Sequence, residues 1–303
     1  SACASVGKQQ LSMGDGVDHS EHITWAAMVP HVAQMTGDRN AARWMCETAS
    51  GCDGDEFRAI QDEWVPERAG KQIESMVRRF LDGEPLQYVL GRWGFRRLDL
   101  MVDRRVLIPR PETELIVDIV LGHIAGRAVP ATVVDLGTGS GAIGLSVLDE
   151  SPVGSVIAHM TDASQDALDV ARANSAGIGR AAVGARFAHG SWFDALGGSL
   201  RGSVDVIVSN PPYIAAGDGE LDASVRNWEP ATALIAGDDG LDDLRVITSG
   251  ATEWLVPGGL LVTEIGHTQA PAVVELYDGS GFAEIRVHSD LAGRDRFVSG
   301  VRP

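Results

Sequence analysis

The chain has 303 residues, of which 44% are hydrophobic and 22% charged, as is typical of a globular protein of one or two domains. No apolar stretch reaches the roughly 18–20 residues of a membrane-spanning helix, and the N-terminal residues lack the apolar segment of a signal peptide. The formal net charge of −17 argues against a protein whose affinity comes from neutralising phosphates, so we expect no direct nucleic-acid partner.

The three cysteines, Cys3, Cys46 and Cys52, form no CxxC pair and have no neighbouring histidine ligands. An odd count with this spacing argues against a disulfide framework and a zinc site, so we expect no metal. A reducing cytoplasm fits best.

The N-terminal third of the chain is predicted to be helical after a flexible tail over residues 1–16, which are rich in Ser, Gly and Gln. Residues 17–83 form the expected helical domain. Its clearest helix runs from Pro66 to Asp82, and an earlier helix starts near Asp38. One apolar face of the later helix repeats at helical spacing, with Ile73, Met76, Val77, Phe80 and Leu81. We interpret Trp25, Trp44 and Trp64 as core residues of this domain.

The spacing of apolar residues is no longer helical between residues 84 and 110, where we expect a β-hairpin linker. Residues 87–90 and 98–102 are predicted to be short strands around Gly91 and Gly94. A helix over residues 112–123 follows, opened by Pro111.

Strands and helices alternate within residues 111–303, which favours an α/β domain with a mainly parallel, Rossmann-like sheet covered on both faces. The short connection between the last two strands predicts an antiparallel hairpin at the sheet edge. Seven strands are predicted, over residues 132–135, 156–162, 185–189, 205–209, 259–264, 283–288 and 296–301.

A glycine-rich loop follows the first strand of this sheet. Gly139-x-Gly141-x-x-Gly144 matches the dinucleotide fingerprint, although that match alone is weak. The candidate cofactor-binding residues of the loop are Gly137, Thr138, Gly139, Ser140 and Gly141.

Two carboxylates favour a particular nucleoside cofactor. Asp135 ends the strand before the loop, where it suits an ammonium group better than a pyrophosphate. S-adenosylmethionine carries an ammonium and a sulfonium and no phosphate. Asp162 ends the next strand, where a carboxylate can accept both ribose hydroxyls of a nucleoside. Trp192, after the third strand, offers a flat face to adenine, with core packing as the alternative.

The stretch Val208-Ser209-Asn210-Pro211-Pro212-Tyr213 ends the fourth strand, next to the first in such a sheet. Asn210 Oδ1 and the Pro211 carbonyl can each accept a hydrogen bond from a planar NH₂ group, and so orient its nitrogen lone pair toward a sulfonium methyl. Pro212 stiffens the turn, and Tyr213 can stack on a planar target. The stretch therefore predicts a methyl-acceptor site in which Asn210 also borders the cofactor.

Several motifs in order resemble the HemK-type peptide chain release factor glutamine methyltransferases. The resemblance covers about residues 84 to 303. The motifs that carry it lie at 83–88, 107–114, 137–141, 190–193, 210–213, 229–234 and 290–296. The resemblance implies a class I methyltransferase domain that uses S-adenosylmethionine. The implied substrate is the glutamine side chain in the Gly-Gly-Gln loop of class I release factors. It also implies that residues 17–83 recognise the protein substrate, and that Arg110 and Glu112 flank the pocket.

Other readings stay open. A related subgroup methylates a ribosomal-protein glutamine, but it has Pro-Arg-Ser-Pro where this chain has Pro-Arg-Pro-Glu at 109–112. Enzymes that methylate an exocyclic amine of adenine or guanine use a similar Asn-Pro-Pro-aromatic motif. That alternative predicts a basic groove for nucleic acid. A dehydrogenase and a non-enzymatic nucleotide-binding scaffold are further alternatives, disfavoured by Asp135 and by the intact acceptor site respectively. We expect a cytoplasmic monomer.

Overall fold

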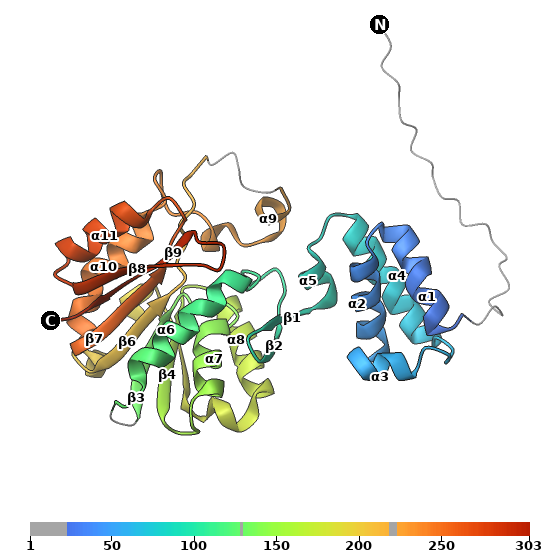
Figure 1. The fold of residues 1–303 in the computed structure, drawn as a ribbon, viewed down its shortest axis with the longest axis horizontal. Coiled ribbons are helices and arrows are strands. Elements are labelled where there is room, and N and C mark those ends of the chain that lie inside the picture. The colour runs from blue at the N-terminus through green and yellow to red at the C-terminus, as the bar shows by residue number, and fades with distance from the viewer. Residues whose placement is uncertain (1–22, 128–129, 218–222) are drawn as a thin grey trace, which may run out of the picture. The chain divides into compact units, whose positions relative to one another are not determined.

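The computed structural model describes residues 23–127, 130–217 and 223–303, so the predicted tail and Cys3 lie outside the described residues. The chain divides into two compact units, one ending at Asp82 and the other beginning at Gly83 (Figure 1). Across these three ranges, no helix combines the length and apolar character needed to cross a membrane.

The first unit is helical in the part that is described. The side chain of Asp38 accepts hydrogen bonds from two backbone N–H groups of the following turn and so caps the second helix, as predicted. The predicted helix after Pro66 is also confirmed, and its apolar face is buried at Ile73, Met76 and Val77. The helices are α1 (Trp25–Thr36), α2 (Arg39–Ser50), α3 (Gly54–Ala59) and α4 (Glu67–Leu81).

Only one of the three tryptophans expected in this core is buried. Trp25 is 2% exposed and meets the ring of Phe57 edge to face. Trp44 and Trp64 are 40% and 59% exposed, so the core prediction is wrong for both. Trp44 lies outside the stripe of α2 that is buried, and Trp64 lies in the connection between α3 and α4.

The second unit opens with a short helix where a strand was predicted. Residues 87–90 belong to α5 (Leu86–Leu90), because Pro85 precedes its first turn and Gly91, at φ 74°, ends it in the left-handed conformation. A hairpin follows, made of the antiparallel strands β1 (Arg92–Phe95) and β2 (Leu98–Met101).

The second unit contains a seven-stranded sheet with strand order β5-β4-β3-β6-β7-β9-β8. Strands β3 to β7 are parallel, and β9 pairs antiparallel with both β7 and the edge strand β8, which confirms the predicted mainly parallel sheet with its antiparallel hairpin. The strands are β3 (Ala131–Leu136), β4 (Val156–Asp162), β5 (Ala185–His189), β6 (Val204–Ser209), β7 (Leu255–Glu264), β8 (Ala283–Ser289) and β9 (Asp295–Val301).

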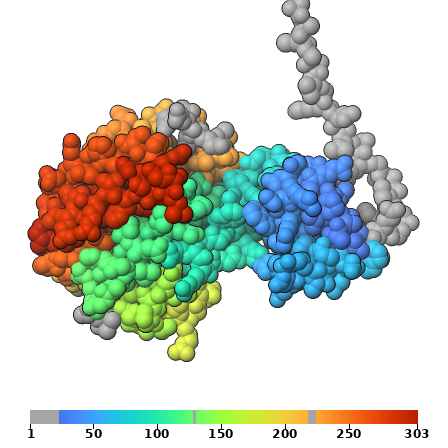
Figure 2. All heavy atoms as spheres, in the orientation of Figure 1, coloured from blue at the N-terminus to red at the C-terminus, as the bar shows by residue number. Residues whose placement is uncertain are grey.

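Helices cover both faces of the sheet. Adjacent residues of β3 point to opposite faces: Val133 belongs to the core beneath α6 and α7, and Val134 to the core beneath α10 and α11. Figure 1 shows α6 on the viewer's side of the sheet, and in Figure 2 the green atoms of this part of the chain face the viewer. The helices are α6 (Glu114–Ile124), α7 (Ala142–Glu150), α8 (Gln165–Gly177), α9 (Ala223–Trp228), α10 (Asp242–Trp254) and α11 (Ala270–Gly279).

Strand order reverses at β3, whose neighbours are β4 on one side and β6 on the other. In open parallel sheets, ligands bind beyond the carboxyl ends of the strands at such a reversal. The segments that follow β3 and β6 are therefore where a ligand site is expected in this fold.

Candidate active site

The glycine loop and the Asn-Pro-Pro-Tyr segment lie side by side at the carboxyl edge of the sheet. β3 and β6 pair in parallel, with Leu136 opposite Ser209, and the Ser209 hydroxyl donates to the Leu136 carbonyl over 2.7 Å. Both segments therefore leave the sheet at the same level, as the predicted order of strands required.

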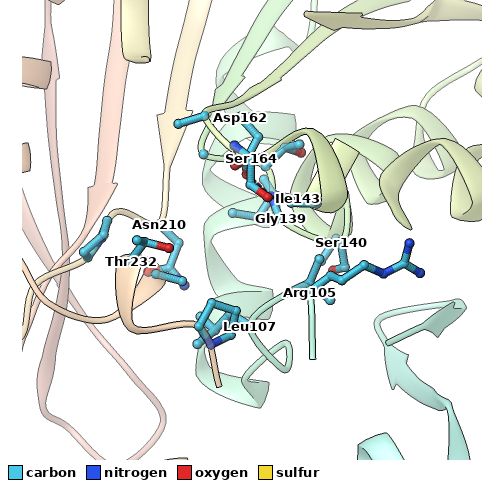
Figure 3. A pocket seen from close by; sticks show the side chains of 18 of the residues that line it. Arg105, Leu107, Gly139, Ser140, Ile143, Asp162, Ser164, Asn210 and Thr232 are labelled. Atoms are coloured by element: carbon cyan, nitrogen blue, oxygen red, sulfur yellow. Dashed lines mark hydrogen bonds between the residues drawn. The ribbon is translucent and has the colours of Figure 1, made fainter. Parts of the chain in front are cut away.

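A cavity of about 420 Å³ opens between these segments, a volume typical of small-molecule sites. Figure 3 shows Asn210 and Thr232 on one side of it and Gly139, Asp162 and Ser164 on the other. Among the predicted site residues, those that line the cavity are Arg110, Gly137, Thr138, Gly139, Ser140, Asp162, Trp192, Asn210 and Pro212.

Three glycines give the loop its shape. Gly137, Gly139 and Gly141 have φ angles of 70°, 56° and 85°, in the left-handed region that side chains disfavour. A Cβ atom at Gly141 would lie 2.8 Å from Leu145 Cδ1, so the Leu145 side chain would have to move to admit a side chain here. The loop therefore brings bare backbone to the cavity wall.

Asp135 supports the loop from beneath and is not among the residues that line the cavity. It is 1% exposed, and its Oδ2 accepts from the Thr138 hydroxyl over 2.6 Å and from the Gly144 N–H over 3.0 Å. Burial raises the pKa of its carboxyl to about 6. Asp135 Oδ1 is buried with no hydrogen-bond partner among the described residues. Contact of this carboxylate with an ammonium group stays a prediction.

Asp162 lines the cavity and holds two backbone turns. Its Oδ2 accepts from the Gly139 N–H over 2.9 Å, and its Oδ1 accepts from the Ser164 N–H over 2.8 Å. Burial raises the pKa of this carboxyl, and the two hydrogen bonds oppose that rise. Each oxygen accepts one of these bonds and keeps a lone pair, so the carboxylate can still accept from hydroxyl groups of a ligand.

Trp192 packs over the start of the glycine loop. A Cβ atom at Gly137 would lie 3.4 Å from the indole ring, and the indole N–H donates to Asp243 Oδ1 over 3.2 Å. The backbone of Trp192 has φ 44°, an uncommon conformation for an aromatic residue. The ring is held in place at the cavity wall, where it offers a planar apolar surface.

The four residues of the acceptor segment have different surroundings. Asn210 and Pro212 line the cavity, and Pro211 is buried. Tyr213 is partly buried, is not among the lining residues, and has its hydroxyl 3.4 Å from Glu264 Oε1. Burial raises the pKa of this phenol.

Of the two flanking residues, Arg110 lines the cavity and Glu112 does not. The Arg110 guanidinium donates to the buried Glu229 carboxylate over 2.6 Å. Glu112 is exposed on the short helix η1 (Pro111–Thr113). The structure therefore places only Arg110 at the pocket wall.

Buried polar residues that sequence reasoning missed support this site. Asn174 of α8 joins the hairpin to the glycine loop: its Nδ2 donates to the carbonyls of Met101 and Ser140, and its Oδ1 accepts from the Met101 N–H over 2.7 Å. Glu264, at the end of β7, accepts from the Thr113 hydroxyl over 2.6 Å. A carboxylate that ends an apolar strand is the signal that pointed to Asp135 and Asp162, and it would also have found Glu264.

Two family models match the chain. The Methyltransferase small domain matches residues 116–235, which hold the glycine loop, Asp162, Trp192 and Asn210. The PrmC N-terminal domain matches residues 23–91, which cover the helices of the first unit and α5.

Curated relatives match both in sequence and over most of their length. A "Release factor glutamine methyltransferase" of Xylella fastidiosa is 43% identical over 235 residues, which cover 78% of this chain and 82% of the relative. A protein of the same name from Burkholderia pseudomallei is 40% identical over 265 residues, covering 86% of this chain and 91% of the relative.

A solved structure, a release-factor-specific protein-(glutamine-N5) methyltransferase from Alicyclobacillus acidocaldarius, is 27% identical with a TM-score of 0.39. The match covers 64% of this chain and 94% of that protein.

Proposed function

The chain belongs to the release factor glutamine methyltransferases, and on that basis we propose its full reaction. It transfers a methyl group from S-adenosylmethionine to the side-chain amide nitrogen of the glutamine in the Gly-Gly-Gln loop of class I peptide chain release factors. Relatives that are 40–43% identical over most of their length support this assignment.

One observation carries the proposal: Asn210 borders the same cavity as the glycine loop and Asp162. An acceptor for a planar amide and a site for a nucleoside are thereby brought together. A nucleotide-binding scaffold or a dehydrogenase has no use for an amide acceptor at this point.

The residues of the cavity fit S-adenosylmethionine. The Asp162 carboxylate can accept from the ribose hydroxyls, the bare backbone of Gly137 and Gly139 permits close approach, and the Trp192 indole offers a face for adenine. When bound, the cofactor supplies an electrophilic methyl group on its sulfonium. Asp135 Oδ1, beneath the glycine loop, is buried with no hydrogen-bond partner among the described residues, and as a carboxylate oxygen it suits an ammonium group.

The acceptor segment activates a nitrogen that is a poor nucleophile. The lone pair of an amide nitrogen is delocalised into its carbonyl, so the nitrogen reacts only where its surroundings favour a pyramidal geometry. Asn210 Oδ1 and the Pro211 carbonyl each accept one N–H of the substrate glutamine and thereby aim the lone pair. No general base is needed for attack, because the nitrogen sheds its proton only after it becomes cationic.

We propose that the helical unit ending at Asp82 grips the release factor. Its match to the PrmC N-terminal domain supports this role. We also propose that the protein works as a monomer in the cytoplasm, where release factors act.

The decisive experiment incubates an unmethylated class I release factor with the protein and S-adenosylmethionine, followed by peptide mass spectrometry. One added methyl group on the loop glutamine is expected, and none on a release factor in which that glutamine is replaced by glutamate. Methyl transfer to a ribosomal-protein glutamine or to RNA instead, under the same conditions, would overturn the substrate assignment while keeping the methyltransferase.

A further inference from the structure

A buried carboxylate outside the cavity connects two of the segments that form it. Glu264 is 1% exposed and is not among the lining residues. Its Oε2 accepts from Thr113 Oγ1 over 2.6 Å, and its Oε1 lies 3.4 Å from the Tyr213 hydroxyl. It therefore contacts both the start of the segment that leads into α6 and the acceptor segment after β6.

The Thr113 hydroxyl contacts both Glu264 and Asn210, and so links the two residues. An ionised carboxylate only accepts hydrogen bonds, so the single hydroxyl proton of Thr113 is committed to Glu264. The Thr113 oxygen can then act toward other neighbours only as an acceptor. Asn210 Nδ2 lies 3.5 Å from this oxygen, at the long limit of a hydrogen bond.

This arrangement selects one of two orientations of the Asn210 side chain. An asparagine amide presents an NH₂ group on one side and a carbonyl oxygen on the other, and its neighbours decide which faces which. With an acceptor at Thr113, the NH₂ group turns toward Thr113 and Oδ1 turns away from it. With the amide reversed, the NH₂ group of Asn210 would face the NH₂ group of the substrate glutamine. Two donors would then meet, and no hydrogen bond could form between them.

We propose that Glu264, acting through Thr113, is a positioning residue that fixes the Asn210 amide with its oxygen available to the substrate. This inference rests on the proposed function, because it assigns Asn210 Oδ1 as the acceptor of the glutamine N–H. Glu264 itself touches neither substrate nor cofactor.

Protonation of Glu264 would reverse this arrangement. Burial raises the pKa of its carboxyl to about 7; nearby Glu112 raises it too, while the Thr113 and Tyr213 hydroxyls and the Arg296 guanidinium oppose the rise. A protonated carboxyl can donate to Thr113, whose hydroxyl proton is then released to point at Asn210. The rate of methyl transfer is therefore expected to fall as the pH drops through about 7.

Three variants test the arrangement by kcat, KM for the release factor, and cofactor Kd. Thr113→Val removes the hydroxyl at nearly constant volume and is expected to lower kcat at least about tenfold, with cofactor Kd unchanged. Thr113→Ser keeps the hydroxyl and is expected to restore kcat to within about threefold of the wild type. Thr248→Val is the matched control, a buried threonine of α10 whose hydroxyl, among the described residues, bonds carbonyls of its own helix.

Glu264→Gln separates positioning from direct contact, because Glu264 does not line the cavity. The variant cannot ionise, so the acidic limb of the kcat profile near pH 7 is expected to disappear whatever rate remains. A wild-type profile without that limb, or the same limb in Glu264→Gln, would overturn the proposal.

Two further outcomes are decisive. Equal losses of kcat in Thr113→Val and Thr113→Ser, with a lowered melting temperature, would assign Thr113 a structural role. This outcome would also overturn the proposed positioning role. If the wild-type protein methylates no release factor, the proposed function itself fails, whereas normal wild-type transfer with an unaffected Thr113→Val refutes only the positioning role.

Discussion

The Arg110 guanidinium donates to Glu229 Oε1 over 2.6 Å, and the backbone N–H of Ile108 faces Glu229 Oε2 at 3.2 Å. One buried carboxylate thus joins the segment before η1 to the segment after α9, and both segments line the cavity. The ion pair therefore holds the wall of the site together across more than a hundred residues of sequence.

Glu229→Ala is expected to destabilise the fold by about 3 kcal/mol. Removing one partner of a buried pair leaves the guanidinium and a buried N–H without an acceptor, and such losses are of order 3–5 kcal/mol. The lower figure applies because the Arg110 side chain is 32% exposed. Urea unfolding measures the change, and Glu275→Ala on the exposed side of α11 should stay within about 0.5 kcal/mol of the wild type. A loss below about 1 kcal/mol for Glu229→Ala would contradict the role of the pair.

Asn210→Ala is expected to lower kcat by about 10²–10³-fold while cofactor Kd changes less than about threefold. The substitution removes the acceptor that orients the substrate amide, and deletion of one preorganised hydrogen-bonding group costs this much in other active sites. Single-turnover methyl transfer and calorimetric titration of the cofactor give the two values. Normal turnover in this variant would remove Asn210 from the mechanism.

Asp162→Ala is expected to weaken S-adenosylmethionine binding by about 10–100-fold. Hydrogen bonds to a charged group contribute roughly 1.5–3 kcal/mol, and the ribose hydroxyls are the proposed donors. The Asp162 carboxylate also holds Gly139 and Ser164, so the loop could be disturbed as well. An analogue without the ribose hydroxyls separates the two effects: its affinity should be nearly equal for wild type and variant. An undiminished loss with the analogue would show that Asp162 acts only on the loop.

Gly141→Ala is expected to add about 1–2 kcal/mol of backbone strain and also to weaken cofactor binding. The new Cβ would meet Leu145 Cδ1 at 2.8 Å and Ala171 Cβ at 3.4 Å. Gly154→Ala is the matched control, because its φ of 83° is nearly the same and nothing lies within 4 Å of the added Cβ. Calorimetry should find cofactor Kd raised only in Gly141→Ala, and equal Kd values for both variants would speak against steric exclusion at the loop.

Asp135→Asn is expected to flatten the dependence of stability on pH. Folding raises the pKa of Asp135 from 3.8 to about 6, so the folded state binds more protons than the unfolded state between these values. The free energy of unfolding therefore falls as the pH rises from about 4 to about 6, by up to roughly 3 kcal/mol from this residue. The variant lacks that ionisation.

Urea unfolding of Asp135→Asn between pH 4 and 8 measures the slope, which is expected to be shallower than that of the wild type below pH 6. Glu264, whose pKa is raised to about 7, keeps part of the slope in both proteins. Asp278→Asn makes the same chemical change on the surface of α11 and should reproduce the wild-type curve. Parallel curves for wild type and Asp135→Asn would mean that Asp135 ionises alike in the folded and unfolded states.

Much of the fold and of the cavity follows from local sequence. The sequence pattern located all seven strands of the sheet, and the clearest are buried parallel strands such as β3 and β6, which are near-continuous hydrophobic runs bounded by turns. The failures have local causes too. Residues 87–90 carry strand-forming side chains, but Pro85 and Gly91 set the backbone as one helical turn. Trp44 and Trp64 are apolar residues at exposed positions, and residue type alone does not distinguish an exposed apolar residue from a core residue.

The partners of the residues that support the site were less accessible to sequence reasoning than the residues themselves. Glu264 is 151 residues from Thr113, and Glu229 is 119 residues from Arg110. Such pairs become visible only when the strand order is known, since local spacing carries no trace of them. Glycines and strand-end carboxylates, by contrast, signal their role through the few residues around them.

Asn174 has a consequence for the order of events at the site. Its single amide bonds both backbone groups of Met101 in the hairpin and the carbonyl of Ser140 in the glycine loop. Hairpin and loop cannot loosen independently without leaving a buried amide unpaired, which is costly. Ordering the loop around a cofactor therefore also restricts the hairpin. Because the hairpin has then already lost conformational entropy, the later binding of the protein substrate carries a smaller entropic cost.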